Sequence, residues 1–108
     1  MSVIMMLPVD VDPKKFEEYA AANADRMNAI SDRAVGRGLI AHRFLGNDET
    51  GQTMVVDEWE KPGDFQAFFE EVGPDIGALM GDLGVTSPPS APQFWRVLES
   101  HDKKGWES

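Results

Sequence analysis

The sequence has 108 residues, of which 42% are apolar, and this is the size and composition of one ordinary globular domain. It contains no cysteine, which excludes disulfides, thiolate metal sites and cysteine nucleophiles. Ten Lys and Arg residues against 19 Asp and Glu residues give a formal charge of −9, which disfavours nucleic acid and anionic membranes as partners.

The longest apolar run, VIMML, is too short to span a bilayer, and no secretory leader precedes it. We therefore expect a cytoplasmic protein with a single domain over residues 1–100 and a charged tail over residues 101–108.

The first part of the chain predicts a strand and one long helix. Residues 2–9, SVIMMLPV, are β-branched and apolar, and Pro8 should end this strand. Asp12 followed by Pro13 predicts a helix start, because an Asp side chain accepts hydrogen bonds from free amides and Pro suits the first helical position. Apolar or small residues then recur every three or four positions, which predicts one helix of about 22 residues that ends at GRG, residues 36–38.

The middle of the chain predicts a hairpin and a second helix. Residues 39–45, LIAHRFL, and residues 52–60 favour strands, and the turn GNDETG between them predicts an antiparallel pair. The break KPGD predicts the next helix start, with Asp64 as its cap. Gly73 followed by Pro74 should bend or split that helix.

A linker with three prolines, TSPPSAP, leads into the last predicted strand, QFWRVLES. The order of elements is therefore β-α-β-β-α-β, which predicts an α+β, ferredoxin-like split β-α-β fold: a four-stranded antiparallel sheet with two helices on one face. The strands are apolar at consecutive positions, so the second face of the sheet must also be covered. Because both helices lie on one side, we expect a second copy of the chain to cover it and form a homodimer.

Polar side chains in the hairpin are the candidates for chemistry. Val55, Asp57 and Trp59 alternate along one strand face and should point toward the helices. A carboxylate in that position needs a partner, and Arg43 on the neighbouring strand is the nearest one if the hairpin register places it on the same face. The pair is then either a plain ion pair or the polar edge of a ligand cavity. His42 lies on the opposite face from Arg43, and we expect it to be structural, at the dimer interface.

Trp59 has two possible roles, as a core residue or as the wall of a ligand cavity. In the second case its cavity would lie between the sheet and the helices, apolar except at one edge. The candidate catalytic residues are Trp59, Asp57 and Arg43. The candidate substrate-binding residues are Met27, Val55, Phe65 and Phe69.

The segment GLIAHRFLGNDETGQTMVVDEWEKPGDFQAFF, and above all its motif EWEKPGDF, resembles the antibiotic biosynthesis monooxygenase family of dimeric α/β barrel proteins. The resemblance implies oxidation of anthrone-like polyketide phenols by O₂ without a cofactor. It places Trp59 on the Trp that lines the substrate cavity in anthrone-oxidising members, and Phe65 where they have a Tyr. Val55 stands where they have an Asn, so a non-catalytic small-molecule-binding or stress-related dimer stays open as the alternative. Haem-degrading members have a Trp where this chain has Phe68, followed by a His that it lacks, which argues against haem breakdown.

The sequence offers no metal or phosphate motif: its two histidines lie far apart, and there is no glycine-rich phosphate loop. Any chemistry must therefore come from the substrate and solvent. An electron-rich phenol that loses a proton forms a carbanion that reduces O₂ by itself, so the protein need supply only a dry cavity and proton handling. We expect a planar phenolic substrate, with no cofactor and no metal.

Overall fold

The computed structural model describes residues 2–86, 90–102 and 104. In chain order its elements are β1 (Val3–Val9), α1 (Pro13–Ala22), α2 (Ala24–Val35), β2 (Leu39–Asn47), β3 (Gln52–Trp59), α3 (Pro62–Asp82) and β4 (Gln93–Arg96). The sheet has the order β2-β3-β1-β4, and every neighbouring pair is antiparallel. The predicted α+β ferredoxin-like fold is therefore confirmed. Within this single chain the sheet is open, with β2 and β4 as its edges.

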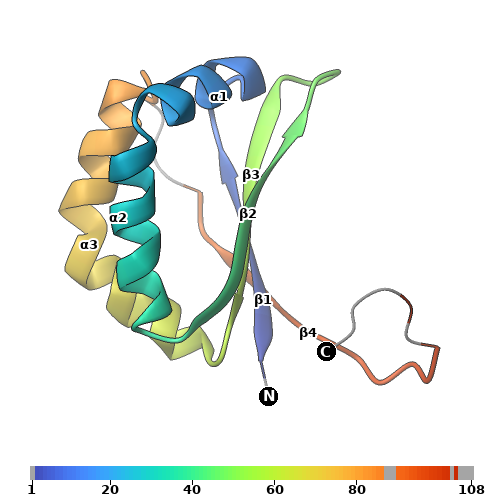
Figure 1. The fold of residues 1–108 in the computed structure, drawn as a ribbon. Coiled ribbons are helices and arrows are strands. Elements are labelled where there is room, and N and C mark those ends of the chain that lie inside the picture. The colour runs from blue at the N-terminus through green and yellow to red at the C-terminus, as the bar shows by residue number, and fades with distance from the viewer. Residues whose placement is uncertain (1, 87–89, 103, 105–108) are drawn as a thin grey trace.

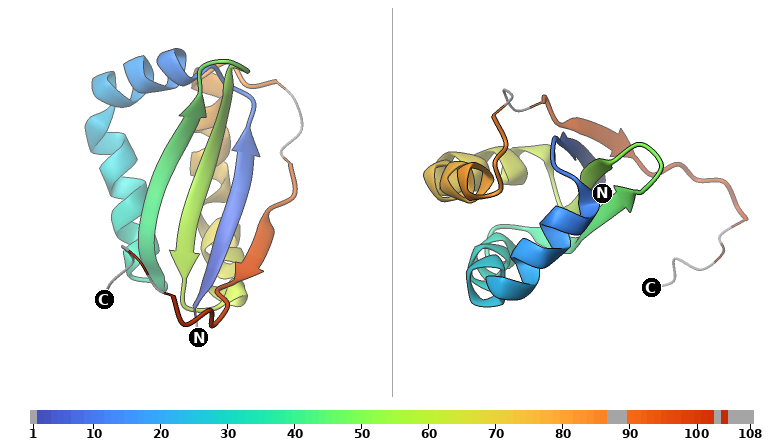
Figure 2. Two further views of the ribbon diagram at one scale, coloured as in Figure 1. Left: turned by 90° about the vertical axis from the view of Figure 1, so that its right-hand side faces the viewer. Right: turned by 90° about the horizontal axis from the view of Figure 1, so that it is seen from above.

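All three helices lie on the same face of the sheet (Figure 1). The view from above shows the helices to one side and an uncovered sheet face on the other, and the left panel of Figure 2 looks onto that open face. The open face is the one that the sequence predicts to be covered by a second copy. Among the described residues, no helix lies on it.

The expected single helix after β1 is wrong, because it breaks at Asn23 into α1 and α2. Asn23 has backbone angles of φ −129° and ψ 36°, outside the helical region. Its side-chain amide donates to the carbonyl oxygen of Tyr19 at 2.9 Å, and the same carbonyl accepts the backbone N–H of Asn23. The apolar spacing continues through the break because both short helices bury the same side.

The start of α1 agrees with the sequence. The Asp12 carboxylate accepts hydrogen bonds from the backbone amides of Lys14 at 3.0 Å and Lys15 at 3.3 Å, and Pro13 occupies the first turn. At the other end, α2 stops at Val35 with Gly36 as its C-cap. These two predicted helix boundaries are confirmed.

The second predicted helix differs from expectation in two respects. It begins after Lys61, so Asp64 lies inside the first turn of α3 and is not its cap. It also continues through Gly73 and Pro74 as one helix of 21 residues, so the expected split does not occur. Asp64 still contributes, because a negative charge in the first turn favours the positive end of the helix dipole.

The first and last strands also have different limits from those predicted. β1 continues through Pro8, which pairs with Met54 of β3. On its other side β1 is paired with β4 only as far as Met6, so Pro8 lies where β1 has become an edge and its missing N–H costs nothing. β4 is correspondingly short, ending at Arg96.

The space between the sheet and the helices holds two packed clusters. The buried residues of the first are Met5, Ala34, Trp59, Phe65, Phe68 and Val72. Those of the second are Val11, Phe16, Leu79 and Leu83. The first cluster lies around the C-terminal end of β3, where the candidate site residues are found. No helix in the described part of the chain is long and apolar enough to cross a membrane.

A buried hydroxyl ties the segment after β1 to β3, and it gives a test of the fold. The Oγ1 of Thr53, which is 3% exposed, donates to the carbonyl oxygen of Val11 at 2.7 Å. Thr53→Val keeps the shape but leaves that carbonyl without its donor, so the free energy of unfolding should fall by about 1–3 kcal/mol in urea titrations. Thr50→Val, in the exposed hairpin turn, is the control and should change it by less than about 0.5 kcal/mol. Equal effects of the two substitutions would contradict the assigned bond.

Candidate active site

A β-bulge in β2 decides which side chains of the hairpin meet. Leu39 pairs with Trp59, but Ala41 pairs with Glu58, so Ile40 is an extra residue in the strand. Beyond the bulge the register continues regularly and places His42 directly opposite Asp57. Directly paired residues in antiparallel strands project from the same face. The bulge therefore puts His42 on the helix-covered face.

The Asp57 carboxylate lies at the centre of the resulting cluster. Its Oδ1 is 2.6 Å from Nδ1 of His42, and its Oδ2 accepts a hydrogen bond from Nε1 of Trp59 at 3.2 Å. The Asp57 side chain is only 7% exposed. Both carboxylate oxygens thus have a nitrogen partner, which offsets the cost of removing the group from water.

The pairing of Asp57 with Arg43, expected from the sequence, is wrong. Arg43 pairs with Val56 and so projects from the open face, where it is exposed. His42, expected at the open face, is the partner instead. A signal for this register was present in the sequence: counting five residues back from Asn47 and five forward from Gln52, the pair that closes the turn, leads to His42 and Asp57. This register was missed at the sequence level because β2 carries apolar residues on both faces, so hydrophobicity does not show which face is buried.

Trp59 is a core residue, and it also borders a cavity. It is 1% exposed, and its indole packs against the rings of Phe65, at 5.7 Å between centroids, and Phe68, at 5.6 Å. It also lines the cavity described next. The motif EWEKPGDF produces this packing: β3 ends at Trp59, and α3, which follows it, places Phe65 and Phe68 against the indole.

A cavity of about 1290 Å³ lies between the sheet and helices α2 and α3. Small-molecule sites usually have about 300–1,000 Å³, so a ligand of several fused rings would fit. The cavity is lined by all four of the candidate substrate-binding residues, Met27, Val55, Phe65 and Phe69. His42, Asp57 and Trp59 also line it and supply a polar edge to a largely apolar wall, whereas Arg43 is not part of it.

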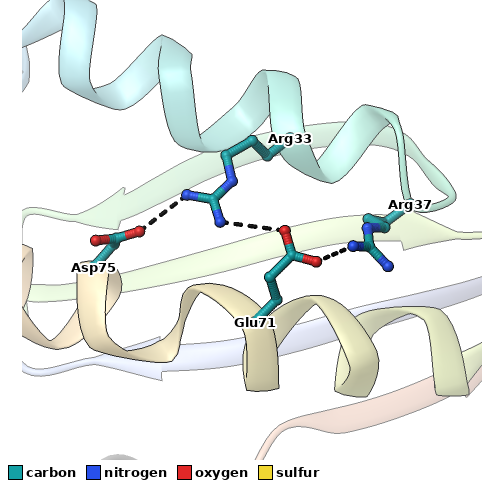
Figure 3. A network of polar contacts seen from close by, with 4 residues as sticks. All are labelled: Arg33, Arg37, Glu71 and Asp75. Atoms are coloured by element: carbon teal, nitrogen blue, oxygen red, sulfur yellow. Dashed lines mark hydrogen bonds and ion pairs between the residues drawn. The ribbon is translucent and has the colours of Figure 1, made fainter.

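The helical wall of the cavity is joined on its outer side by a charged network (Figure 3). The guanidinium of Arg33 on α2 donates to Asp75 at 3.0 Å and to Glu71 at 3.2 Å, both on α3, and Arg37 also pairs with Glu71. The hydrogen bond to Glu71, followed by that to Asp75, raises the pKa of Arg33 above its ordinary value. Because these groups are exposed, they add little stability, but they fix which turns of α2 and α3 face each other.

Within residues 2–86, 90–102 and 104, no group of three or more His, Cys, Asp or Glu side chains is placed to hold a metal ion. The polar groups of the site are those of the His42, Asp57 and Trp59 cluster.

No protein-family model matches the sequence, and no curated protein matches it either. Solved structures do. A candidate antibiotic biosynthesis monooxygenase from Bordetella bronchiseptica superposes with a TM-score of 0.66 at 17% identity, covering 91% of this chain and 98% of that one. A candidate member of the same group from Deinococcus radiodurans gives 0.58 at 17% identity, covering 97% and 100%.

A monooxygenase from Streptomyces coelicolor, solved in complex with nanaomycin D, gives a TM-score of 0.58 at 15% identity, covering 92% of this chain and 91% of that one. The chain has the fold of these monooxygenases. At these identities the likeness shows the fold, and the assignment of an activity depends on the site itself.

The bond between Trp59 and Asp57 can be tested through stability. Trp59→Phe removes the Nε1 donor and should lower the free energy of unfolding by about 1.5–3 kcal/mol, the usual range for hydrogen bonds to charged groups. In a double-mutant cycle with Asp57→Ala, the two changes should couple by about 0.5–3 kcal/mol because they remove the same interaction. Strict additivity of the two effects in denaturant titrations would mean that the two side chains are not bonded.

Proposed function

We propose that this protein oxidises a planar phenolic, polyketide-like small molecule with O₂, without a cofactor. The observation that carries the proposal is a large, mainly apolar cavity with one polar edge, at which a buried carboxylate holds an imidazole. The fold it shares with a monooxygenase solved with nanaomycin D supports the same conclusion. Flat aromatic molecules suit a wall made of Phe side chains, which stack on or meet ring edges.

The proposed reaction needs only the substrate, O₂ and proton transfer. For an anthrone, loss of a proton from the methylene carbon gives a carbanion, which transfers an electron to O₂ and then combines with the superoxide formed to give a hydroperoxide. Removal of the second hydrogen from that carbon cleaves the O–O bond, so that one oxygen atom stays as the quinone carbonyl and the other leaves as water. The protein contributes a base at the polar edge and a mainly apolar cavity that binds the substrate.

Oxygen consumption tests this proposal, and two glycines of α3 supply matched variants. Gly77 lines the cavity, Gly81 does not, and a Cβ atom added at either would lie in open space. Gly77→Leu should therefore narrow the cavity and lower the rate of O₂ uptake with anthrone, while Gly81→Leu keeps the wild-type rate. Both variants should fold, because replacing an open helical Gly gains up to about 1 kcal/mol of helix propensity.

The stoichiometry should be one O₂ consumed for each anthraquinone formed. If the wild-type protein binds anthrone in calorimetry but causes no O₂ uptake above the buffer rate, it is a non-catalytic binding protein. That result would agree with Val55 replacing an Asn.

We further propose that a second copy of the chain covers the open face of the sheet. The face carries apolar side chains from all four strands, namely Ile4, Met6, Leu45, Met54, Val56 and Trp95. Leu45 is 47% exposed and Trp95 is 53% exposed, and exposed apolar side chains gathered on one face mark an interaction site. Beyond β4 the chain extends away on the same side (Figure 1), and Val97 and Leu98 are exposed there. A second copy offers an identical apolar face at the spacing at which sheets pack.

A charge on the open face should prevent this association. Val56 projects from the centre of that face, so Val56→Lys would bury an unpaired ammonium group and should convert a dimer to a monomer in sedimentation velocity. Ala67→Lys adds the same charge at an exposed position of α3 and should leave the dimer unchanged. The proposal fails if the wild-type chain sediments as a monomer, or if Val56→Lys remains a dimer of unaltered stability.

A further inference from the structure

We infer that His42 is the catalytic base of this cavity and that Asp57 is its positioning residue. The inference rests on the proposed function, because it concerns proton removal from the same class of planar, weakly acidic substrate. The sequence predicted that Asp57 and Arg43 form the polar edge of the cavity. In the structure the pair is His42 from β2 and Asp57 from β3.

Asp57 is poorly placed to act on a substrate directly. One carboxylate oxygen lies 2.6 Å from the His42 ring, and the other accepts a hydrogen bond from Trp59. Only 7% of the side chain is exposed, and each oxygen already has a nitrogen partner. An Asp that is buried and doubly bonded in this way serves to hold its donors in one orientation.

The His42 ring has one nitrogen in use and one available. Trp59 can only donate a hydrogen bond, so the Asp57 carboxylate acts as acceptor on that side, and the short contact to Nδ1 is best satisfied when Nδ1 carries the proton. In the neutral ring this leaves the lone pair on Nε2. Among the described residues, Nε2 has no hydrogen-bond partner, while the His42 side chain is 28% exposed and lines the cavity.

The surroundings fix the ring further. The edge of the imidazole meets Phe44, with centroids 4.9 Å apart and planes at 85°. Phe44 in turn packs on Phe16 of α1, with centroids 4.3 Å apart. The bulge at Ile40 is what brings His42 to this face, since regular alternation from Leu39 would have placed Ala41 and Arg43 there. Bulges are frequent beside active sites because they redirect a side chain in this manner.

His42 alone can carry out every proton transfer that the reaction needs. Nε2 takes the first proton from the methylene carbon of the anthrone, and the imidazolium formed is stabilised by the Asp57 carboxylate. It returns that proton to the peroxide anion that forms after O₂ adds to carbon. Nε2 then removes the second hydrogen from the same carbon as the O–O bond breaks, and the proton passes to the departing hydroxide to give water.

The direct test is hydrogen exchange without oxygen. Anthrone is incubated anaerobically in D₂O with the protein, and deuterium entering its methylene group is followed by NMR. Wild-type protein should accelerate exchange, and His42→Asn should lower the rate by about 10²-fold or more, the usual contribution of a general base. An Asn amide can still donate to Asp57, so the cluster keeps its hydrogen bond. His101→Gln, at the other histidine of the sequence, is the matched control and should exchange as the wild type does.

Two further variants separate catalysis from support of the fold. His42→Ala opens space for free imidazole, which should restore exchange in a concentration-dependent way. Asp57→Asn should reduce the rate of exchange at saturating anthrone while changing the dissociation constant for anthrone, measured by calorimetry, much less. An equal loss of binding and rate in Asp57→Asn would contradict its role as a positioning residue.

The outcomes also distinguish this inference from the proposed function. If hydrogen exchange depends on His42 but no O₂ is taken up, the proposed oxygenase activity is wrong and the assignment of His42 as the base stands. If O₂ uptake is unaffected by His42→Asn, the assignment of His42 as the base is wrong and the proposed oxygenase activity stands. Absence of protein-dependent exchange in the wild type, with anthrone bound, would overturn the inference outright.

Discussion

The arrangement of this site depends on one buried carboxylate. Asp57 sits on a strand face covered by helices, where an ion without partners would cost several kcal/mol. Its two oxygens are occupied by His42, from the neighbouring strand, and by Trp59, two residues further along its own strand. Each partner also makes a contact away from the carboxylate. The indole packs on Phe65 and Phe68, and the imidazole lines the cavity. The carboxylate thereby joins the hydrophobic core to the polar edge of the site.

The cavity and the packed core share the space between the sheet and the helices. On their outer sides α2 and α3 are linked by the ion pairs of Arg33 with Glu71 and Asp75 (Figure 3), and on their inner sides residues of both helices line the cavity. The glycine at position 77 adds to this space, at the cost in helix propensity that a glycine brings. The ion pairs and the space for a substrate thus lie on opposite sides of the same two helices.

Local chemistry made most of the fold predictable. The cap at Asp12, the glycine stop at Gly36 and the hairpin turn each act within a few residues, and the structure agrees with them. The exceptions lie where a tertiary contact or a single competing side chain decides. Asn23 ends α1 through its own amide, and Pro8 is accommodated because β4 does not extend along that part of β1.

For the site, the sequence identified the cavity wall but not the polar pair. Val55, Asp57 and Trp59 follow strict alternation on β3, so their common face could be read directly. The partner of Asp57 depended on register across the hairpin, and one extra residue at Ile40 reverses which side chains of β2 face the helices. Because β2 has apolar residues on both faces, its hydrophobic pattern does not indicate that reversal. Counting residues from the Asn47 and Gln52 pair at the turn does indicate it.

The central claim is that Asp57 fixes His42 with a proton on Nδ1 and a lone pair on Nε2. Long-range ¹⁵N–¹H correlation NMR on protein labelled at histidine nitrogens measures this directly, with His101→Gln used to assign the two rings. The account predicts a protonated Nδ1 and an unprotonated Nε2 for His42 in the neutral ring, and loss of that preference in Asp57→Asn. A His42 ring protonated on Nε2, or one that averages between both forms in the wild-type protein, would contradict it.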